Sequence, residues 1–125
     1  MKILFVCSAN VDRSPTAEYI YKDRAGLEVK SAGTACYAQK PVNKELVQWA
    51  DAILCMESRH KRYIVEVFAN IISNKMIDIL NIKTLIRGEV CEYRHPALIE
   101  IIREKTDAWL HENHAEIRNE IEKEK

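Results

Sequence analysis

Apolar residues along the chain fall into short runs that predict alternating strands and helices. "KILFVC" at residues 2–7 is a continuous apolar run rich in β-forming residues, typical of a strand buried on both faces. Three further runs indicate strands at residues 27–34, 51–57 and 75–80. Strands that alternate with helices favour a parallel sheet flanked by helices, so we expect an α/β domain.

Helices are expected between these strands. Ser14 and Pro15 read as an N-cap followed by proline at the first helical position, and Gly26 suits the end of that helix. The other predicted helices cover residues 43–50, residues 58–72 and a long segment that begins at Pro96. Residues 81–95 show no clean period and are predicted to form a loop.

The 125 residues are enough for one domain with a single core, which we place at residues 1–112. Residues 113–125 are mostly charged. We expect them to extend the last helix into solvent or to fray.

Composition narrows the classes of function. Lys plus Arg equals Asp plus Glu, at 19 each, so generic binding to nucleic acid or a membrane surface has little support. The four cysteines have no C-x-x-C spacing and do not cluster with histidines, so we expect no metal. "MKILFVC" is too short for a signal peptide, and a reducing, cytoplasmic setting is expected.

The stretch "VCSANVDRSP", residues 6–15, carries the clearest chemistry. A loop that leads from a strand into a helix points backbone N–H groups inward, and the helix dipole adds positive charge. Arg13 adds a planar fork for two phosphate oxygens, and the same field favours the thiolate of Cys7. The spacing predicts a nucleophile beneath a bound phosphate. The alternative is that Cys7 is a small core residue at the end of a strand.

These residues resemble the signature of the low-molecular-weight protein tyrosine phosphatases. Within that family, the sequence is most similar to a compact prokaryotic branch. That signature is a strand, then Cys-x-x-Asn-x-x-Arg-Ser-Pro, then a helix, and Cys7, Asn10, Arg13, Ser14 and Pro15 stand in those places. "SAGT" and "DAILCM" also resemble family segments, in the right order. The resemblance implies a three-layer fold with a four-stranded parallel sheet, strand order 2-1-3-4, and helices on both faces.

The resemblance also implies roles for single residues. Cys7 would be the nucleophile and Arg13 the phosphate clamp, while Ser14 would support the thiolate. Asn10 would hold the loop at positive φ, braced by Ser31. The phosphate-binding loop would comprise Ser8, Ala9, Asn10, Val11, Asp12, Arg13 and Ser14.

Three positions depart from the family pattern. Ala9 replaces a glycine and fits only if its φ is negative, and Asp12 replaces a second cysteine. The family's general acid is an Asp before Pro in a late loop, but here His95 precedes Pro96. His95 could serve as the acid, with Glu92 as a second candidate, or it could simply cap the last helix.

Two tyrosines near the expected site each have two interpretations. Tyr93 and Tyr37 lie in predicted loops, where they would either wall an aryl substrate or pack on the surface. The cluster "SRHKR", which contains His60, reads as the solvated face of a helix start.

The expected function is hydrolysis of a phosphomonoester, with phosphotyrosine favoured, through a cysteinyl-phosphate intermediate and without a cofactor. The partners would be a phosphorylated protein or small aryl phosphate, with inorganic phosphate as product or inhibitor. One alternative is a phosphate- or phosphoprotein-binding module that has lost turnover with the Asp. Arsenate reduction is less favoured, because it needs two further late cysteines and only Cys91 lies there.

Overall fold

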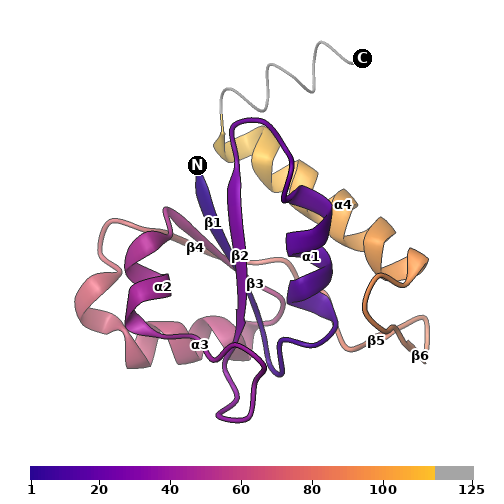
Figure 1. The fold of residues 1–125 in the computed structure, drawn as a ribbon, viewed down its shortest axis with the longest axis horizontal. Helices are drawn as coiled ribbons and strands as arrows, with labels where there is room; N and C mark the ends of the chain where they lie inside the picture. Colours follow the sequence, from indigo (N-terminus) through magenta and orange to yellow (C-terminus); the bar gives the residue numbers. More distant parts are fainter. Residues whose placement is uncertain (115–125) are drawn as a thin grey trace.

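The computed structural model describes residues 1–114, which are built on a four-stranded parallel sheet in the order β2-β1-β3-β4 (Figure 1). This arrangement confirms the predicted α/β class and strand order. The strands are β1 (Lys2–Cys7), β2 (Glu28–Gly33), β3 (Ala52–Cys55) and β4 (Met76–Ile79).

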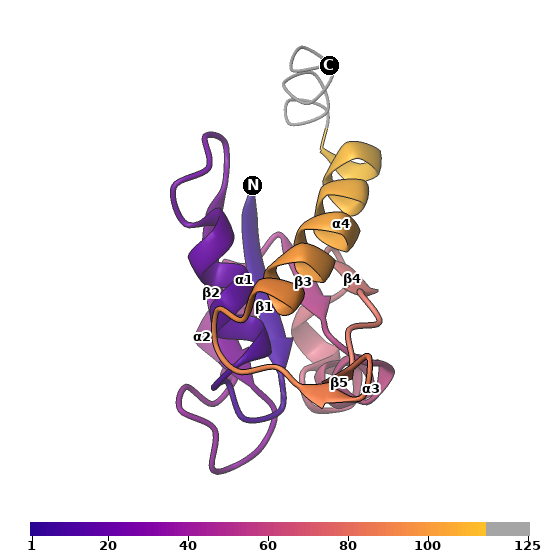
Figure 2. The same ribbon diagram turned by 90° about the vertical axis from the view of Figure 1, so that its right-hand side faces the viewer.

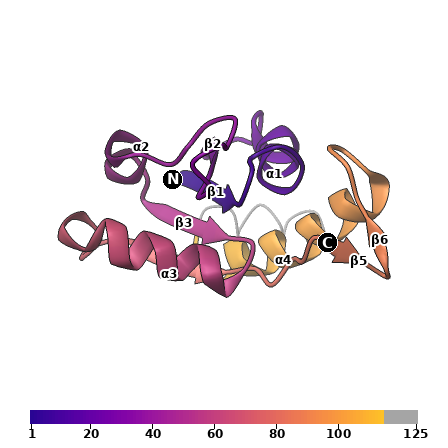
Figure 3. The ribbon, with the colours of Figure 1, turned by 90° about the horizontal axis from the view of Figure 1, so that it is seen from below.

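Helices cover both faces of the sheet in a three-layer arrangement. Figure 3 shows α1 and α4 on one side of the sheet and α2 and α3 on the other. Their bounds are α1 (Arg13–Tyr21), α2 (Lys44–Trp49), α3 (Ser58–Val67) and α4 (Pro96–Asn113), and a 3₁₀ turn, η1, covers Ala69–Ile71.

The alternation of side chains along β1 divides the core into two parts. Ile3 and Phe5 face the layer that contains α1 and α4, whereas Leu4 and Val6 face the layer that contains α2 and α3. All four side chains are fully buried. Burial of one such side chain contributes about 1.5–3 kcal/mol, so β1 anchors both halves of the core.

Two predicted helices end earlier than their apolar patterns indicate. The first predicted helix ends at Tyr21, and the chain then turns before Gly26, whose φ is 83°. The third ends at Val67, and the remaining predicted turn is the separate 3₁₀ segment. The helix α4 ends at Asn113. Of the extension or tail predicted at residues 113–125, residues 115–125 lie outside the described residues.

The prediction of a plain loop over residues 81–95 is wrong, because this segment contains a short antiparallel hairpin. Its strands are β5 (Leu85–Ile86) and β6 (Glu89–Val90). Arg87 and Gly88 connect them with φ values of 53° and 81°, the paired positive values of a two-residue hairpin turn. The hairpin lies at the same end of the molecule as the carboxyl end of β1 (Figure 2).

The carboxyl end of β1 is also where the chain changes direction across the sheet. β1 is flanked by β2 on one side and by β3 on the other, so successive connections leave this point in opposite directions. Ligands of open parallel sheets bind at such switch points.

Within the described residues, no helix has both the length and the apolar character needed to cross a membrane.

Candidate active site

The loop between β1 and α1 forms a tight cradle directly after Cys7. Asn10 has a φ of 57°, a conformation that asparagine adopts more readily than most residues, and its side chain is fully buried. Its Nδ2 donates to Ser14 Oγ at 2.8 Å and to Ser31 Oγ at 3.0 Å. Among residues 1–114, Ala9 is not one of the non-glycine residues at positive φ, so its methyl group fits the loop.

The end of β2 packs closely against this cradle. A Cβ atom added to Gly33 would collide with the carbonyl oxygen of Ser8 and would lie 2.6 Å from Ala38 Cβ. The backbone N–H of Ala35 donates to that same Ser8 carbonyl at 3.0 Å. A glycine is therefore required at position 33, and the cradle is held from the β2 side as well as by Asn10.

The Cys7 thiol lies at the base of the cradle, with only 3% of the residue exposed. Its Sγ is 2.9 Å from Ser14 Oγ. Ser14 Oγ accepts a hydrogen bond from Asn10, and its single hydrogen has two acceptors within reach, the sulfur at 2.9 Å and the Ala32 carbonyl at the longer distance of 3.3 Å. The sulfur therefore lies beside a hydroxyl donor, at the end of β1 and at the base of the loop that leads into α1.

The Arg13 side chain is held from behind and lines the same pocket as Cys7. Its Nη1 donates to Glu57 Oε2 at 2.7 Å and to the Ile82 carbonyl at 2.8 Å. One edge of the fork is thereby fixed, and the guanidinium retains further N–H groups for an anion. The pocket has a volume of about 280 Å³ and is lined by Cys7, Ser8, Ala9, Val11, Asp12, Arg13, Tyr37, Arg59, Thr84 and Cys91.

Glu57 holds the Arg13 guanidinium from the start of α3. Burial works to raise the pKa of its carboxyl, but the hydrogen bonds and charges of Arg13 and Arg59 outweigh burial and lower that pKa from 4.5 to about 2. Arg59 Nη2 donates to the same oxygen, Oε2, at 2.8 Å. The carboxylate is therefore ionised at neutral pH and pairs with two guanidinium groups beside the pocket, which leaves one net positive charge among the three side chains.

Replacing Glu57 with glutamine is expected to lower the free energy of unfolding by about 1–3 kcal/mol at pH 7, because a charged hydrogen-bond acceptor of Arg13 is lost. The folded-state pKa of this carboxyl lies below its unfolded value of 4.5. Its stabilisation is therefore complete above pH 4.5 and is lost as the pH falls towards about 2. Urea unfolding of both proteins should show a stability gap that closes over this interval. A gap that is independent of pH would mean that the charge of Glu57 contributes nothing.

The reading of His60 as a solvated residue is wrong, since only 1% of it is exposed. Its Nδ1 accepts a hydrogen bond from the Glu57 backbone N–H at 3.0 Å, and its Nε2 lies 2.8 Å from Ser8 Oγ. Burial, together with Arg13 and Arg59, lowers the pKa of His60 to about 4. The neutral ring with Nδ1 as acceptor must carry its hydrogen on Nε2, which donates to Ser8. His60 thus ties the start of α3 to the residue next to Cys7.

The structure does not bring His95 or Glu92 to the pocket that contains Cys7. His95 is the N-cap of α4, and its Nδ1 accepts a hydrogen bond from the Ala97 N–H at 3.1 Å. Glu92 is exposed, and its carbonyl accepts from the His95 N–H at 2.9 Å. The cap explains why a histidine precedes Pro96.

The two tyrosines predicted to wall the substrate line different hollows. Tyr37 is 78% exposed and lines the pocket of Cys7 and Arg13. Tyr93 lines an adjoining groove along α1, together with Val11, Pro15, Glu18, Tyr19, Lys22 and Gln39. Val11 lines both hollows, so the groove and the pocket meet at this residue.

Cys55 and Cys91 lie on opposite sides of the sheet. Cys55 packs in the core on the α2 and α3 side, and burial raises its pKa to about 12. Cys91 packs on the same side as Cys7 and lines the pocket with it. Cys55 is therefore an inert core thiol.

Within the described residues, no group of three metal-ligating side chains is placed to hold a metal ion.

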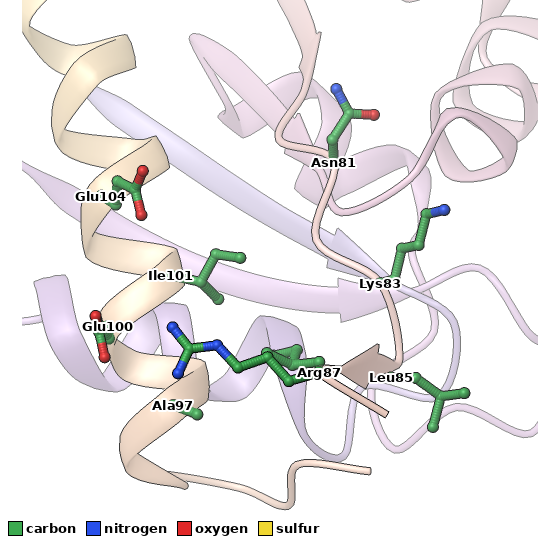
Figure 4. A pocket seen from close by; sticks show the side chains of 9 residues that line it. Asn81, Lys83, Leu85, Arg87, Ala97, Glu100, Ile101 and Glu104 are labelled. Carbon is green, nitrogen blue, oxygen red and sulfur yellow. The ribbon is translucent and has the colours of Figure 1, made fainter. Parts of the chain in front are cut away.

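A separate hollow of about 290 Å³ lies between α4 and the segment that leads into the hairpin (Figure 4). Lys83 and Arg87 lie on the segment side, and Glu100 and Glu104 extend from α4. The hollow shares no lining residue with the pocket of Cys7 and Arg13, so it is separate from the cradle that follows Cys7.

Comparisons with known proteins agree with the fold and the cradle. Residues 2–45 match the profile of the low molecular weight phosphotyrosine protein phosphatases. The protein-arginine-phosphatase of Geobacillus stearothermophilus is 34% identical, over 54% of this chain and 62% of the relative. That of Bacillus subtilis is 32% identical, over 54% and 63%. The chain thus spans less than two thirds of the length of the curated relatives that it matches.

A solved structure extends the similarity to most of the chain. The low molecular weight protein tyrosine phosphatase of Streptococcus pyogenes superposes with a TM-score of 0.71, covering 90% of this chain and 92% of that one. Its sequence identity is 16%, so it supports the fold alone. Together, these similarities show that the chain has the fold of the low-molecular-weight protein tyrosine phosphatases, and that residues 2–45, which include the cradle, match the profile of that family.

Proposed function

We propose that this protein hydrolyses phosphomonoesters, with phosphotyrosine in proteins as its substrate, through a cysteinyl-phosphate intermediate. The observation that carries the proposal is the position of Cys7. Its sulfur lies 2.9 Å from Ser14 Oγ, at the base of a pocket whose lining includes Arg13. A nucleophile, a supporting donor and an anion clamp thus meet at one point.

The chemistry divides into two displacements at phosphorus. Cys7 Sγ first attacks the phosphorus atom as the bond to the aryl oxygen breaks, which forms the cysteinyl phosphate. Water then attacks the same atom, the phosphorus–sulfur bond breaks, and inorganic phosphate leaves. Loop N–H groups and Arg13 stabilise the oxygen charges at both stages, and the reaction as proposed needs no cofactor.

Phosphotyrosine suits the rim of the pocket. Val11 and Tyr37 supply apolar and aromatic surface for a phenyl ring, and Val11 is 47% exposed. Arg59 adds a positive charge to the lining. Asp12 lines the same pocket, so the lining carries both charges, and the apolar and aromatic surface is the feature that favours a neutral ring.

Phosphoarginine is nevertheless the second candidate substrate, because both curated relatives are named protein-arginine-phosphatases. The chemistry at Cys7 would be the same, with a nitrogen leaving group. We favour phosphotyrosine because Val11 and Tyr37 offer a surface on which an aromatic ring can pack. A cytoplasmic location belongs to the same proposal, since a reactive thiol persists in a reducing compartment.

Turnover of one peptide made in two phosphorylated forms tests the choice of substrate. We expect kcat/KM for the phosphotyrosine peptide to exceed that for the phosphoarginine peptide by about tenfold, because contact of the phenyl ring with Val11 and Tyr37 contributes about 1–1.5 kcal/mol. The Cys7→Ala variant is the blank for contaminating phosphatases. The reverse preference would favour the arginine substrate. Phosphate binding without turnover of either peptide would favour the alternative that the protein is a phosphate-binding module without catalytic activity.

A further inference from the structure

The proposed reaction needs a proton donor that the late loop does not supply. A phenolate leaves poorly unless its oxygen is protonated, and a positioned acid contributes typically about 10²–10⁴-fold. His95 caps α4, and Glu92 is an exposed loop residue that does not line the pocket. The acid must therefore be sought among the groups that share the pocket with Cys7.

Within the described part of the chain, Asp12 is the one carboxyl-bearing side chain that lines this pocket. It directly precedes Arg13 and lies at the N-cap of α1. The other ionisable lining groups are Cys7, Arg13, Arg59, Tyr37 and Cys91. Among all the ionisable groups that line the pocket, only the carboxyl group of Asp12 combines a readily transferred proton with a position on the cradle itself.

The contact between Asp12 and the late loop fixes the orientation of its carboxyl group. Asp12 Oδ1 accepts a hydrogen bond from the backbone N–H of Tyr93 at 2.8 Å. The next residue is fixed as well, because the Arg94 N–H donates to Thr16 Oγ1 at 2.9 Å. An oxygen that accepts an N–H hydrogen bond in this way acts as the carbonyl oxygen of the acid. The acidic hydrogen consequently belongs on Oδ2.

We propose that Asp12 is the general acid of the hydrolysis described under Proposed function, on which this inference rests. As Cys7 attacks phosphorus and the bond to the aryl oxygen breaks, the proton on Asp12 Oδ2 passes to the departing oxygen, and the phenol leaves neutral. The Asp12 carboxylate then takes a proton from the water that attacks the cysteinyl phosphate. Phosphate and the Cys7 thiolate are released, and the acid is restored for the next cycle.

Two substitutions at this position separate proton transfer from loop anchoring. In Asp12→Asn, the amide oxygen still accepts from the Tyr93 N–H, but the group cannot deliver a proton. In Asp12→Ala, both functions are lost. We expect Asp12→Asn to lower kcat on phenyl phosphate on the order of 10²-fold. The loss on p-nitrophenyl phosphate should be at least about tenfold smaller, because that leaving group needs less protonation.

Inhibition by inorganic phosphate controls for the integrity of the cradle and should change less than about threefold in Asp12→Asn. Equal losses on both substrates, or unchanged kcat on phenyl phosphate, would overturn the role of Asp12. A leaving-group-dependent loss in His95→Ala, with none in Asp12→Asn, would also overturn it. Wild-type protein that turns over neither substrate would instead refute the proposed hydrolysis, and the acid assignment with it.

Discussion

Replacing Cys7 with serine is expected to abolish turnover while phosphate binding is retained. The serine hydroxyl is a far weaker nucleophile than a thiolate, so we expect a loss on the order of 10⁵-fold or more in kcat. The loop N–H groups and Arg13 are unchanged in this variant, and the anion no longer meets a negatively charged sulfur. Calorimetric titration with inorganic phosphate should give an affinity equal to or tighter than that of the wild type.

Cys36→Ser is the matched control, because Cys36 is exposed and lies outside the pocket lining. It should leave both turnover and phosphate affinity unchanged. Substantial activity in Cys7→Ser, with normal binding, would contradict the assignment of the nucleophile. Loss of binding together with turnover would indicate a structural role for the thiol.

Replacing Arg13 with lysine is expected to have the second largest effect. The guanidinium donates from one nitrogen to both Glu57 and the Ile82 carbonyl and still presents N–H groups to the pocket. A lysine ammonium keeps the charge but cannot satisfy both sides with a planar fork. We expect a loss of roughly 10²–10³-fold in kcat/KM and at least about tenfold weaker inhibition by phosphate.

Circular dichroism and the urea midpoint provide the control for folding of this variant, since Arg13 is buried. Near-normal kinetics in Arg13→Lys would show that the guanidinium fork is dispensable and that charge alone suffices. The contrast with Glu57→Gln is informative, because that change leaves the fork in place and removes only its negatively charged partner.

The sheet was predictable because its signal is local. Each central strand is a continuous apolar run, and the two faces of β1 need apolar residues at every position from Ile3 to Val6. The hairpin at residues 85–90 was missed for the opposite reason. Its strands have two residues each and show no period, and the turn depends on positive φ at an arginine, which sequence patterns do not indicate.

The same distinction applies to the site. The cradle is contiguous in sequence, so its spacing alone predicts where Cys7 and Arg13 face one another. Glu57 and His60 come from the start of α3. Glu57 is 44 residues from Arg13 along the chain. Among neighbouring basic residues, His60 looks solvated, and only the packing of α3 against the cradle buries it. The capping pattern of Glu57 and His60 was a signal that could have indicated a fixed histidine.

The role of Asp12 depends equally on tertiary contacts. From the sequence, a carboxylate in an anion-binding loop is an unfavourable departure. The structure pairs it with the backbone of Tyr93, from a loop 81 residues away, and places it on the lining of the pocket. The missing acid of the late loop and the unusual acid of the cradle are therefore connected, which neither departure indicates alone.

The most direct test of the proposed mechanism is to identify the residue that carries the phosphoryl group during turnover. Wild-type protein mixed with excess phosphotyrosine peptide, quenched in acid within milliseconds and digested, should yield the peptide containing Cys7 with a phosphoryl group on sulfur. The adduct should be absent when the peptide carries unphosphorylated tyrosine. A phosphoryl group on any other residue of the chain, with Cys7 unmodified, would contradict the proposed mechanism.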